Sequence, residues 1–296
     1  MREISRRRFI YGSISALGIG SSLSFLNACS TSGLSTTRSL SDDIQLVQRF
    51  PQILVPGEVR LPISLAQSSG IIRASGDFKF PELLTAKIVD LSNDTVITEN
   101  VGASLHGLEI SLPYYPFRTN IQKPGNYSLV VESGQVDGAA FSVLERDQVS
   151  VPKVGDALPA FDTPTFDNSR QVASICTRLP KPCPFHEITL TAALQRGMPI
   201  AYMIATPSHC STGTCTPASE QLIKVGKSVG DRAIFIHAEV YADDAATTIA
   251  PAVKAFNLNF EPTLFVADAT GKVVDRLDAV FDEKEIFDAL ARAGVI

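Results

Sequence analysis

The sequence of 296 residues contains no tryptophan, only four histidines and five cysteines, and no two of its cysteines stand in a Cys-x-x-Cys pair. Acidic residues outnumber basic ones, 31 to 26, and no basic stripe is present, so we expect no nucleic-acid partner. The N-terminal apolar run is shorter than the ~20 residues that a membrane-spanning helix needs. An apolar content of 45% and this length are typical of a globular protein of about two domains.

The first 28 residues have the pattern of an export signal. Paired arginines in SRRRFI precede a modest apolar run, YGSISALGIGSSLSFL, which is typical of a twin-arginine signal peptide. A short anchor helix that stays in place is the alternative. The next segment, LNAC, resembles a lipobox, and this resemblance implies that Cys29 carries a lipid. We therefore predict a protein of the cell envelope, anchored to the outer face of the cytoplasmic membrane, with a flexible tether over residues 29–44.

Four cysteines remain if Cys29 carries the lipid, and they form two locally spaced pairs. An even number of cysteines in an exported protein predicts disulfides. Cys176 and Cys183 lie outside the expected core strands, so we predict that they form a structural disulfide that ties a loop. Two other interpretations stay open. One is a zinc site that adds His186, since cysteine and histidine are zinc ligands, and the other is a relay of electrons to the second pair.

Residues 45–150 predict an all-β domain. Short runs with alternating or β-branched character, among them EVRLPISLA, LTAKIVDL, LEISLPYY and NYSLVVES, are separated by turn formers such as SND and KPGN. Several short strands at this spacing favour an antiparallel β-sandwich. KPGNYSLVV resembles the Gly-x-Tyr entry to a late strand of immunoglobulin-like domains, which implies an immunoglobulin-like sandwich with Tyr127 at a corner.

Residues 151–296 change to an α/β pattern. Apolar runs of strand length occur in GMPIAYMIA, AIFIHAEVY and TLFVAD, and KVVDRLDAV is the expected hairpin partner of the last. Helical periodicity appears in CTPASEQLIKVGKSVG, and helices are also expected at DDAATTIAPAVKAFN and EKEIFDALARAG. Strands that alternate with helices and end in a hairpin and a helix predict an α/β sheet with mixed strand directions.

This order of elements resembles the thioredoxin fold over residues 154–296. The segment EPTLFVADATGKVVDRLDAV is similar to the part of thioredoxin-like proteins in which a cis proline precedes a strand and an Asp-x-x-Gly turn follows it, with Pro262, Asp268 and Gly271 at those positions. VGDALPAF is similar to the lead-in of exported thioredoxin-like and peroxiredoxin-like proteins. TRLPKPCPFHEITL followed by ATPSHCSTGTCTP resembles exported actinobacterial thioredoxin-domain lipoproteins with a Cys-x4-Cys centre. The implied architecture is a sandwich followed by a thioredoxin-like domain.

The resemblance to thioredoxins implies a redox centre at Cys210 and Cys215. A helix start is predicted at Thr216 and Pro217, just after the second cysteine. Cys215 then stands at the nucleophile position of thioredoxins, where the helix dipole favours the thiolate, and Cys210 is the resolving partner. The neighbouring His209 is expected to add positive charge or to move a proton.

The predicted activity is thiol-disulfide exchange with envelope proteins, whose thiols or disulfides are the partners. The resemblance implies that Pro262 and the backbone of Glu261 hold the partner's extended chain beside the sulfurs. We expect no cofactor and no metal, and contact with the membrane only through the lipid on Cys29.

Three alternatives to this activity stay open. In the first, Cys210 and Cys215 form a permanent disulfide in a non-catalytic binding module, since fold alone grants no activity. A thiol peroxidase of the peroxiredoxin type would use Cys210 to attack peroxide, although Thr206 lies one residue too far from Cys210 for that family's Thr-x-x-Cys. A Cu(I)-binding Sco-like chaperone would use both thiolates with His237 as the remote ligand.

Overall fold

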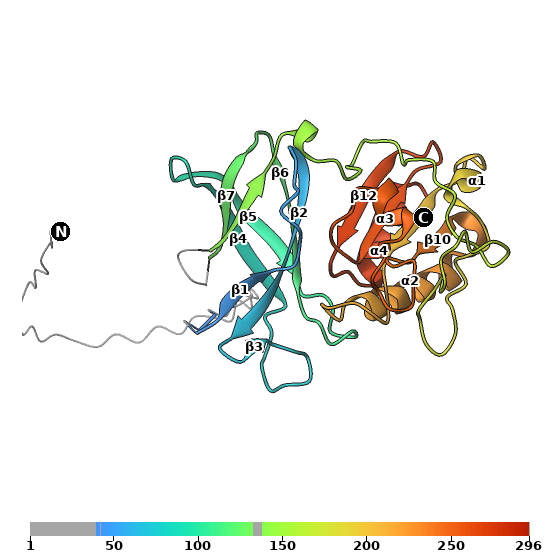
Figure 1. Ribbon diagram of the computed structural model, residues 1–296. Helices are drawn as coiled ribbons and strands as arrows, with labels where there is room; N and C mark the ends of the chain where they lie inside the picture. The colour runs from blue at the N-terminus through green and yellow to red at the C-terminus, as the bar shows by residue number, and fades with distance from the viewer. Residues whose placement is uncertain (1–39, 42, 133–137, 296) are drawn as a thin grey trace, which may run out of the picture. The chain divides into compact units, whose positions relative to one another are not determined.

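Antiparallel strands make up the first half of the computed structural model, which describes residues 40–41, 43–132 and 138–295 (Figure 1). These strands form two four-stranded sheets. The first sheet contains β1 (Gln45–Gln48), β2 (Gly57–Gln67), β3 (Gly70–Ile71) and β6 (Tyr115–Ile121). The second has the order β5-β4-β7-β8 and contains β4 (Leu83–Asp90), β5 (Thr95–Ser104), β7 (Gly125–Val131) and β8 (Ala139–Val143).

Both sheets contribute to one hydrophobic core. Leu61 and Ile63 of β2 are fully buried, and so is Ile88 of β4. In β4 the buried positions alternate with less buried ones, which is the period of two expected for a strand with one covered face. The all-β character predicted for residues 45–150 is thus observed, whereas the immunoglobulin-like assignment stays a prediction.

The folded part of the chain begins before residue 45. Leu40 and Ile44 are buried and belong to the core of the two sheets, so the C-terminal end of the predicted tether is packed against the domain. The predicted signal peptide, the lipidation residue Cys29 and the rest of the tether lie outside the described residues.

One strand of the first half was predicted in the wrong place. The run LEISLPYY alternates like a strand, but Leu108 is 48% exposed and residues 107–113 contain turns instead. Gly107 adopts a φ of 76° there, a conformation that glycine reaches without steric cost. The strand itself, β6, begins at Tyr115 and pairs with β2. Leu112 and Tyr114 of this run still pack with Val280, so an alternating apolar pattern indicates buried side chains and does not by itself establish a strand.

The second half contains a sheet of mixed direction with the order β10-β9-β11-β12. Its strands are β9 (Ile200–Ile204), β10 (Ile234–Ala238), β11 (Thr263–Ala267) and β12 (Val273–Asp278). β9 and β10 are parallel, and β11 is antiparallel to both β9 and β12. This is the thioredoxin-like order that the resemblance implied for residues 154–296.

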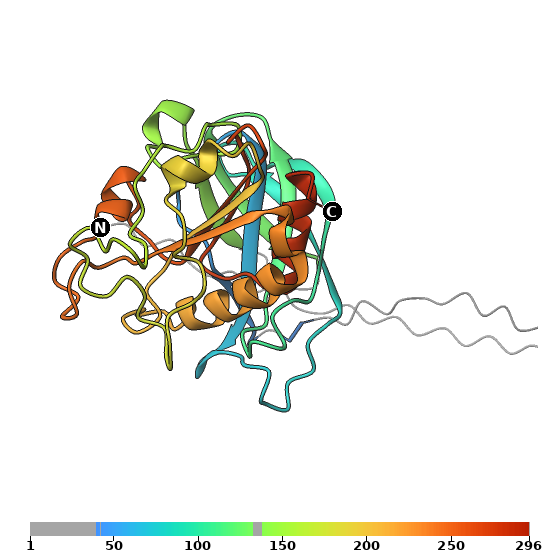
Figure 2. The ribbon, with the colours of Figure 1, turned by 90° about the vertical axis from the view of Figure 1, so that its right-hand side faces the viewer.

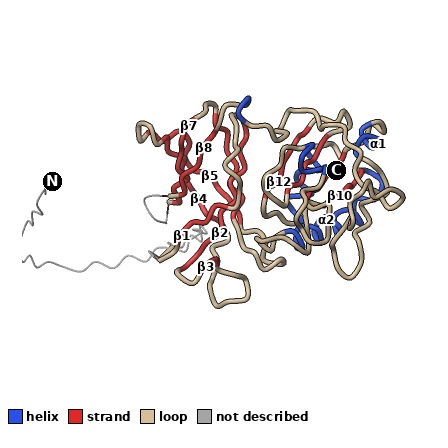
Figure 3. The backbone as a smooth tube through the Cα atoms, in the orientation of Figure 1, coloured by secondary structure: helices blue, strands red, loops and turns tan. Residues whose placement is uncertain are grey.

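Helices cover both faces of this sheet. On one face, Met203 and Leu264 pack in a core with α2 (Cys215–Val229) and α4 (Glu283–Arg292), which lie side by side (Figure 2). On the other face, Tyr202 and Phe265 pack with α1 (Leu190–Leu194) and α3 (Pro251–Ala255). Figure 3 shows these helices gathered in the second half of the chain. Across the residues that the structure describes, no helix combines the length and the apolar character needed to cross a bilayer.

The helix predicted over residues 243–257 is shorter than expected. The Asp243 carboxylate accepts hydrogen bonds from the N–H and hydroxyl of Thr247, which fixes a turn and keeps this stretch out of the helix. The helix α3 starts at Pro251, a residue suited to the first helical turn because its missing N–H is not needed there. Helix α1 was not predicted at all.

Buried ion pairs connect the strands of the first half to the second half. Arg60 of β2 donates to both carboxylate oxygens of Glu285 in α4, at 2.7 and 2.5 Å. The Tyr114 hydroxyl donates to the same carboxylate at 2.7 Å, and His106 Nδ1 lies 2.8 Å from Asp282. Buried charges are tolerated only when they are paired in this way, so these contacts couple the sheets of the first half to α4.

Candidate redox site

The loop between β9 and α2 brings Cys210 and Cys215 together. Residues 210–213 form a turn in which the Gly213 N–H donates to the Cys210 carbonyl at 3.2 Å, and Gly213 has a φ of 67°, which favours glycine. The helix α2 then begins at Cys215 with Thr214 as its N-cap, one residue earlier than the start predicted at Thr216. The two sulfurs and a carboxylate oxygen of Glu261 lie within 4.8 Å of one another.

Cys210 carries the favoured thiolate of this pair. Its sulfur is half-buried and accepts the Cys215 N–H at 3.3 Å, and the Thr212 hydroxyl lies 3.2 Å away. Hydrogen bonding by the Cys215 thiol lowers the pKa of Cys210 to about 4, and the Thr212 hydroxyl and the N–H groups of Thr214 and Cys215 add to this effect against the opposing effect of burial. A thiolate held by donors at a helix start is the reactive form of cysteine.

Cys215 is the protonated partner. Its side chain is fully buried, and its sulfur lies 3.5 Å from Glu261 Oε2. Its hydrogen bond to the Cys210 sulfur, together with burial and the Glu261 carboxylate, raises the pKa of Cys215 far above its ordinary range. Cys215 therefore keeps its proton until a base removes it.

Glu261 is placed to act as that base. Burial raises the pKa of Glu261 to about 7, and the negative charge of Cys210 acts in the same direction. The same carboxylate accepts the N–H of Thr206 at 3.1 Å, which fixes it at the end of β9. From the sequence, only the backbone of Glu261 was predicted to act, because no local signal distinguishes this glutamate from the other acidic residues.

The geometry favours the opposite roles from those predicted from the sequence. Cys215 was expected to attack and Cys210 to resolve, because only the start of a helix was visible in the sequence. In the structure Cys215 is inaccessible. Cys210 is half-buried, and its sulfur accepts hydrogen bonds from the backbone N–H groups at the helix start. Of the two sulfurs, only that of Cys210 is exposed enough for a partner to reach it.

His209 and Pro262, the other two residues predicted at this site, differ in how far the structure agrees with the prediction. The His209 ring lies edge-on to Tyr241, with 6.0 Å between ring centroids, and no hydrogen bond joins it to either sulfur within the described part of the chain. Pro262 follows a cis peptide bond with Glu261 and directly precedes β11, as the resemblance implied. The Asp-x-x-Gly turn is also present, since the Gly271 N–H donates to the Asp268 carbonyl at 2.9 Å.

The other two cysteines lie in a separate buried cluster. Cys176 and Cys183 are free cysteines in this structure, where the sequence predicted a disulfide between them. They meet His186 and His237, and the ligand atoms of all four side chains lie within 4.8 Å of one another. His237 therefore faces this cluster, which contradicts its assignment as a remote copper ligand for Cys210 and Cys215.

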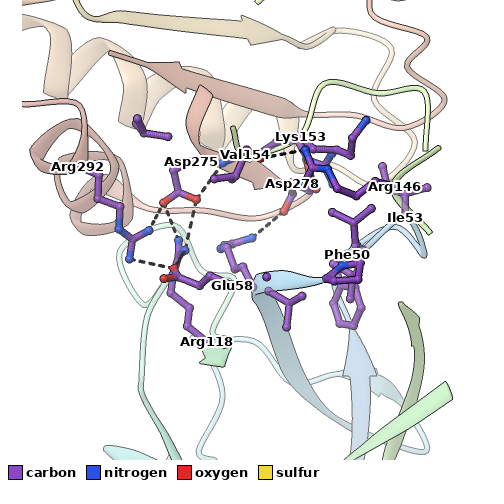
Figure 4. A pocket seen from close by; sticks show the side chains of 18 residues that line it. Phe50, Ile53, Glu58, Arg118, Arg146, Lys153, Val154, Asp275, Asp278 and Arg292 are labelled. Atoms are coloured by element: carbon purple, nitrogen blue, oxygen red, sulfur yellow. Dashed lines mark hydrogen bonds and ion pairs between the residues drawn. The ribbon is translucent and has the colours of Figure 1, made fainter. Parts of the chain in front are cut away.

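A pocket of about 300 Å³ lies beside the ion pairs that couple the two halves (Figure 4). Arg118 and Arg292 both bond to Asp275 on its wall, and Arg276 Nε lies 3.0 Å from Asp278. These cations are already neutralised, and none of the described residues that line the pocket is a cysteine or a histidine. The described lining of the pocket therefore contributes no thiol or imidazole group.

Comparison with known proteins finds matches among solved structures. No protein-family model and no curated protein sequence matches the chain. Among solved structures, the crystal structure of a thiol:disulfide interchange protein of the thioredoxin family from Chlorobium tepidum TLS aligns with 48% of this chain and 97% of its own, at 16% identity and a TM-score of 0.33. The strand order described above, and not this likeness, defines the fold of residues 154–296.

Proposed function

We propose that this protein exchanges thiols and disulfides with partner proteins through Cys210 and Cys215. The observation that carries the proposal is the asymmetry of the pair. Cys210 is accessible and holds a stabilised thiolate, while Cys215 is buried, protonated and 3.5 Å from a carboxylate whose pKa is about 7. A permanent structural disulfide requires neither the thiolate donors nor the carboxylate.

The reaction proceeds in two displacements. The Cys210 thiolate attacks one sulfur of the partner's disulfide, the partner's S–S bond breaks, and one partner sulfur leaves as a thiolate while Cys210 holds the other in a mixed disulfide. Glu261 then takes the proton of Cys215, whose thiolate attacks the Cys210 sulfur and releases the second partner thiolate. The partner's disulfide is reduced to two thiols, and Cys210 and Cys215 are oxidised to a disulfide. The same steps run in reverse when the partner is reduced and the centre is oxidised.

We place this activity in the cell envelope. The proposal rests on the twin-arginine pattern, the lipobox at Cys29 and the thioredoxin-like order of residues 154–296. The Glu261 carboxylate lies 3.5 Å from the Cys215 sulfur, and the Glu261 backbone is joined to Pro262 by a cis peptide bond, so these two residues are the proposed contact for the partner's extended chain. Through its ion pairs with α4, the first half acts as a fixed docking surface.

Trapping of the mixed disulfide tests the assigned roles. The full-length protein is reduced and mixed with a peptide disulfide, and covalent adducts are mapped by mass spectrometry. Cys215→Ser accumulates an adduct on Cys210, because the second displacement is lost, and Cys210→Ser forms none. An adduct that accumulates on Cys215 in Cys210→Ser overturns the assigned roles.

The reduction potential separates exchange from a structural bond. A centre that exchanges thiols has a potential above about −270 mV, and a value below roughly −300 mV marks a structural disulfide. The second value, together with the absence of any adduct, indicates a binding module without redox activity.

A further inference from the structure

We infer that Cys176, Cys183, His186 and His237 form a binding site for a tetrahedral zinc ion. All four side chains are at most 8% exposed, and their ligand atoms gather within 4.8 Å. Two cysteines and two histidines are a ligand set of closed, structural zinc sites. The inference is independent of the proposed exchange activity, since it uses neither Cys210 nor Cys215.

The distances between the ligand atoms fit a zinc ion at their centre. A tetrahedral ion with zinc–sulfur bonds of about 2.3 Å and zinc–nitrogen bonds of about 2.05 Å requires ~3.5 Å between sulfur and nitrogen and ~3.4 Å between the nitrogens. Cys183 Sγ lies 3.2 Å from His186 Nε2 and 3.5 Å from His237 Nδ1. The two nitrogens are 3.3 Å apart. Three atoms from two segments, the loop with Cys183 and His186 and the strand with His237, thus already have the spacing of a zinc coordination shell.

Hydrogen bonding alone does not account for this triangle of atoms. His237 Nε2 donates to the Ala205 carbonyl at 3.0 Å, so in the neutral imidazole Nδ1 is a bare lone pair. The Cys183 thiol and His186 Nε2 supply at most one proton each, which makes two hydrogen bonds for three contacts. A cation at the centre satisfies all three lone pairs and the Cys176 sulfur together.

The surroundings hold the ligands in position. The backbone N–H of His237 donates to the Phe185 carbonyl at 2.9 Å, which lays the segment that carries His186 along the edge strand β10. The bond to the Ala205 carbonyl fixes the tautomer of His237, as partners of the second nitrogen commonly do for metal-binding histidines. The His186 ring is held by the edge of Phe166, with 5.4 Å between ring centroids.

The charge of the cluster is also balanced by zinc. Two thiolates and two neutral imidazoles around a divalent cation give a neutral group, which removes the cost of burying unpaired charge. The Cys183 N–H donates to the Cys176 sulfur at 3.3 Å, a contact that stabilises a thiolate ligand. Arg178, between the two cysteines, pairs with Glu220 of α2 at 2.6 Å and so ties this loop to the helix.

The site connects to the redox loop through Thr177. Its hydroxyl accepts the Ser208 N–H at 3.1 Å, and its carbonyl accepts the Ser208 hydroxyl at 2.6 Å, two residues before Cys210. The zinc ion would thus anchor the segment on which the redox loop rests. Its role is structural, since all four coordination positions are taken by protein ligands.

Metal content decides the inference. The full-length protein is purified without chelators, zinc per chain is measured by inductively coupled plasma mass spectrometry, and disulfides are mapped. We expect about one zinc per chain, retained in the control variant Cys210→Ser/Cys215→Ser and lost in Cys183→Ser and His237→Gln. Cobalt(II) in place of zinc should give the intense visible bands of tetrahedral coordination and a sulfur-to-cobalt charge-transfer band in the wild type and the control variant.

Measurements on the unchanged protein keep the test decisive if those variants do not fold. Removal of the metal by a chelator should lower the Tm, and zinc chloride alone, but not magnesium chloride, should restore it. A Cys176–Cys183 disulfide in metal-free protein as purified overturns the inference, and so does a Tm that does not respond to the chelator. Zinc that disappears only in the control variant places the ion at Cys210, Cys215 and Glu261 and also overturns it.

Discussion

Replacement of Glu261 by glutamine should slow the second displacement and leave the first intact. The Glu261 carboxylate lies 3.5 Å from the buried Cys215 sulfur and has a pKa of about 7. General base catalysis by a positioned side chain typically contributes a factor of ~10²–10⁴. We therefore expect Glu261→Gln to slow the attack of Cys215 on the mixed disulfide about 100-fold at pH 8.

The assay follows both displacements in one experiment. Reduced protein is mixed in a stopped-flow instrument with one equivalent of an aromatic disulfide whose two halves leave as coloured thiolates. Attack by Cys210 releases the first half, and attack by Cys215 releases the second. The wild type should show a fast and a slower phase, and Glu261→Gln should change only the slower one.

The pH dependence separates base catalysis from a structural effect. Because the carboxylate must be ionised, the second phase of the wild type should accelerate with rising pH and level off by about pH 7, since the mixed disulfide removes the Cys210 charge that helps to raise the pKa of Glu261. This dependence should be absent in Glu261→Gln. Asp288→Asn, which removes an exposed carboxylate that pairs with Lys284 on α4, is the control for loss of one negative charge. If Glu261→Gln slows both phases equally, or keeps the same pH profile, the assignment of Glu261 as the base is refuted.

Three further predictions concern pKa values and stability. Thr212→Ala should raise the pKa of Cys210 by roughly one unit, since a hydrogen bond to a charged group is worth about 1.5 kcal/mol or more, and Thr212→Ser should not; the pH profile of Cys210 alkylation measures this. The raised pKa of Glu261 means that the folded state binds this proton more tightly than the unfolded state, so its contribution to stability is lost as pH rises from about 4.5 to about 7. Reduced Glu261→Gln should therefore gain roughly 1–2 kcal/mol over the wild type across that range in urea denaturation, about half of the unscreened value, and a constant difference contradicts this. Arg60→Ala should destabilise the protein by about 3–5 kcal/mol, because it leaves Glu285 charged and buried, whereas replacement of both residues by apolar ones should cost much less; equal losses for the single and double variants would count against a buried ion pair.

Local patterns in the sequence predicted much of the second half. The runs 197–205, 233–241 and 263–268 each contain a strand because they are short, continuous and apolar, and Pro262 and the Asp-x-x-Gly turn lie where the resemblance placed them. Local sequence patterns failed where tertiary packing or a side-chain hydrogen bond decided the secondary structure. The alternating run at 108–115 contains turns although Leu112 and Tyr114 are buried against Val280, and most of 243–257 is a loop because Asp243 binds the backbone that a helix would use.

The sequence by itself determined where the paired cysteines stand and the order of the elements that bear them, because residue type, periodicity and turn formers act over a few neighbouring positions. Only the tertiary structure decided that Cys210 is accessible and Cys215 buried, and that the Glu261 carboxylate reaches Cys215 across 46 positions. It also brought His237 to Cys183, 54 positions away. Such long-range contacts depend on how strands and helices pack, and this packing leaves no local pattern in the sequence.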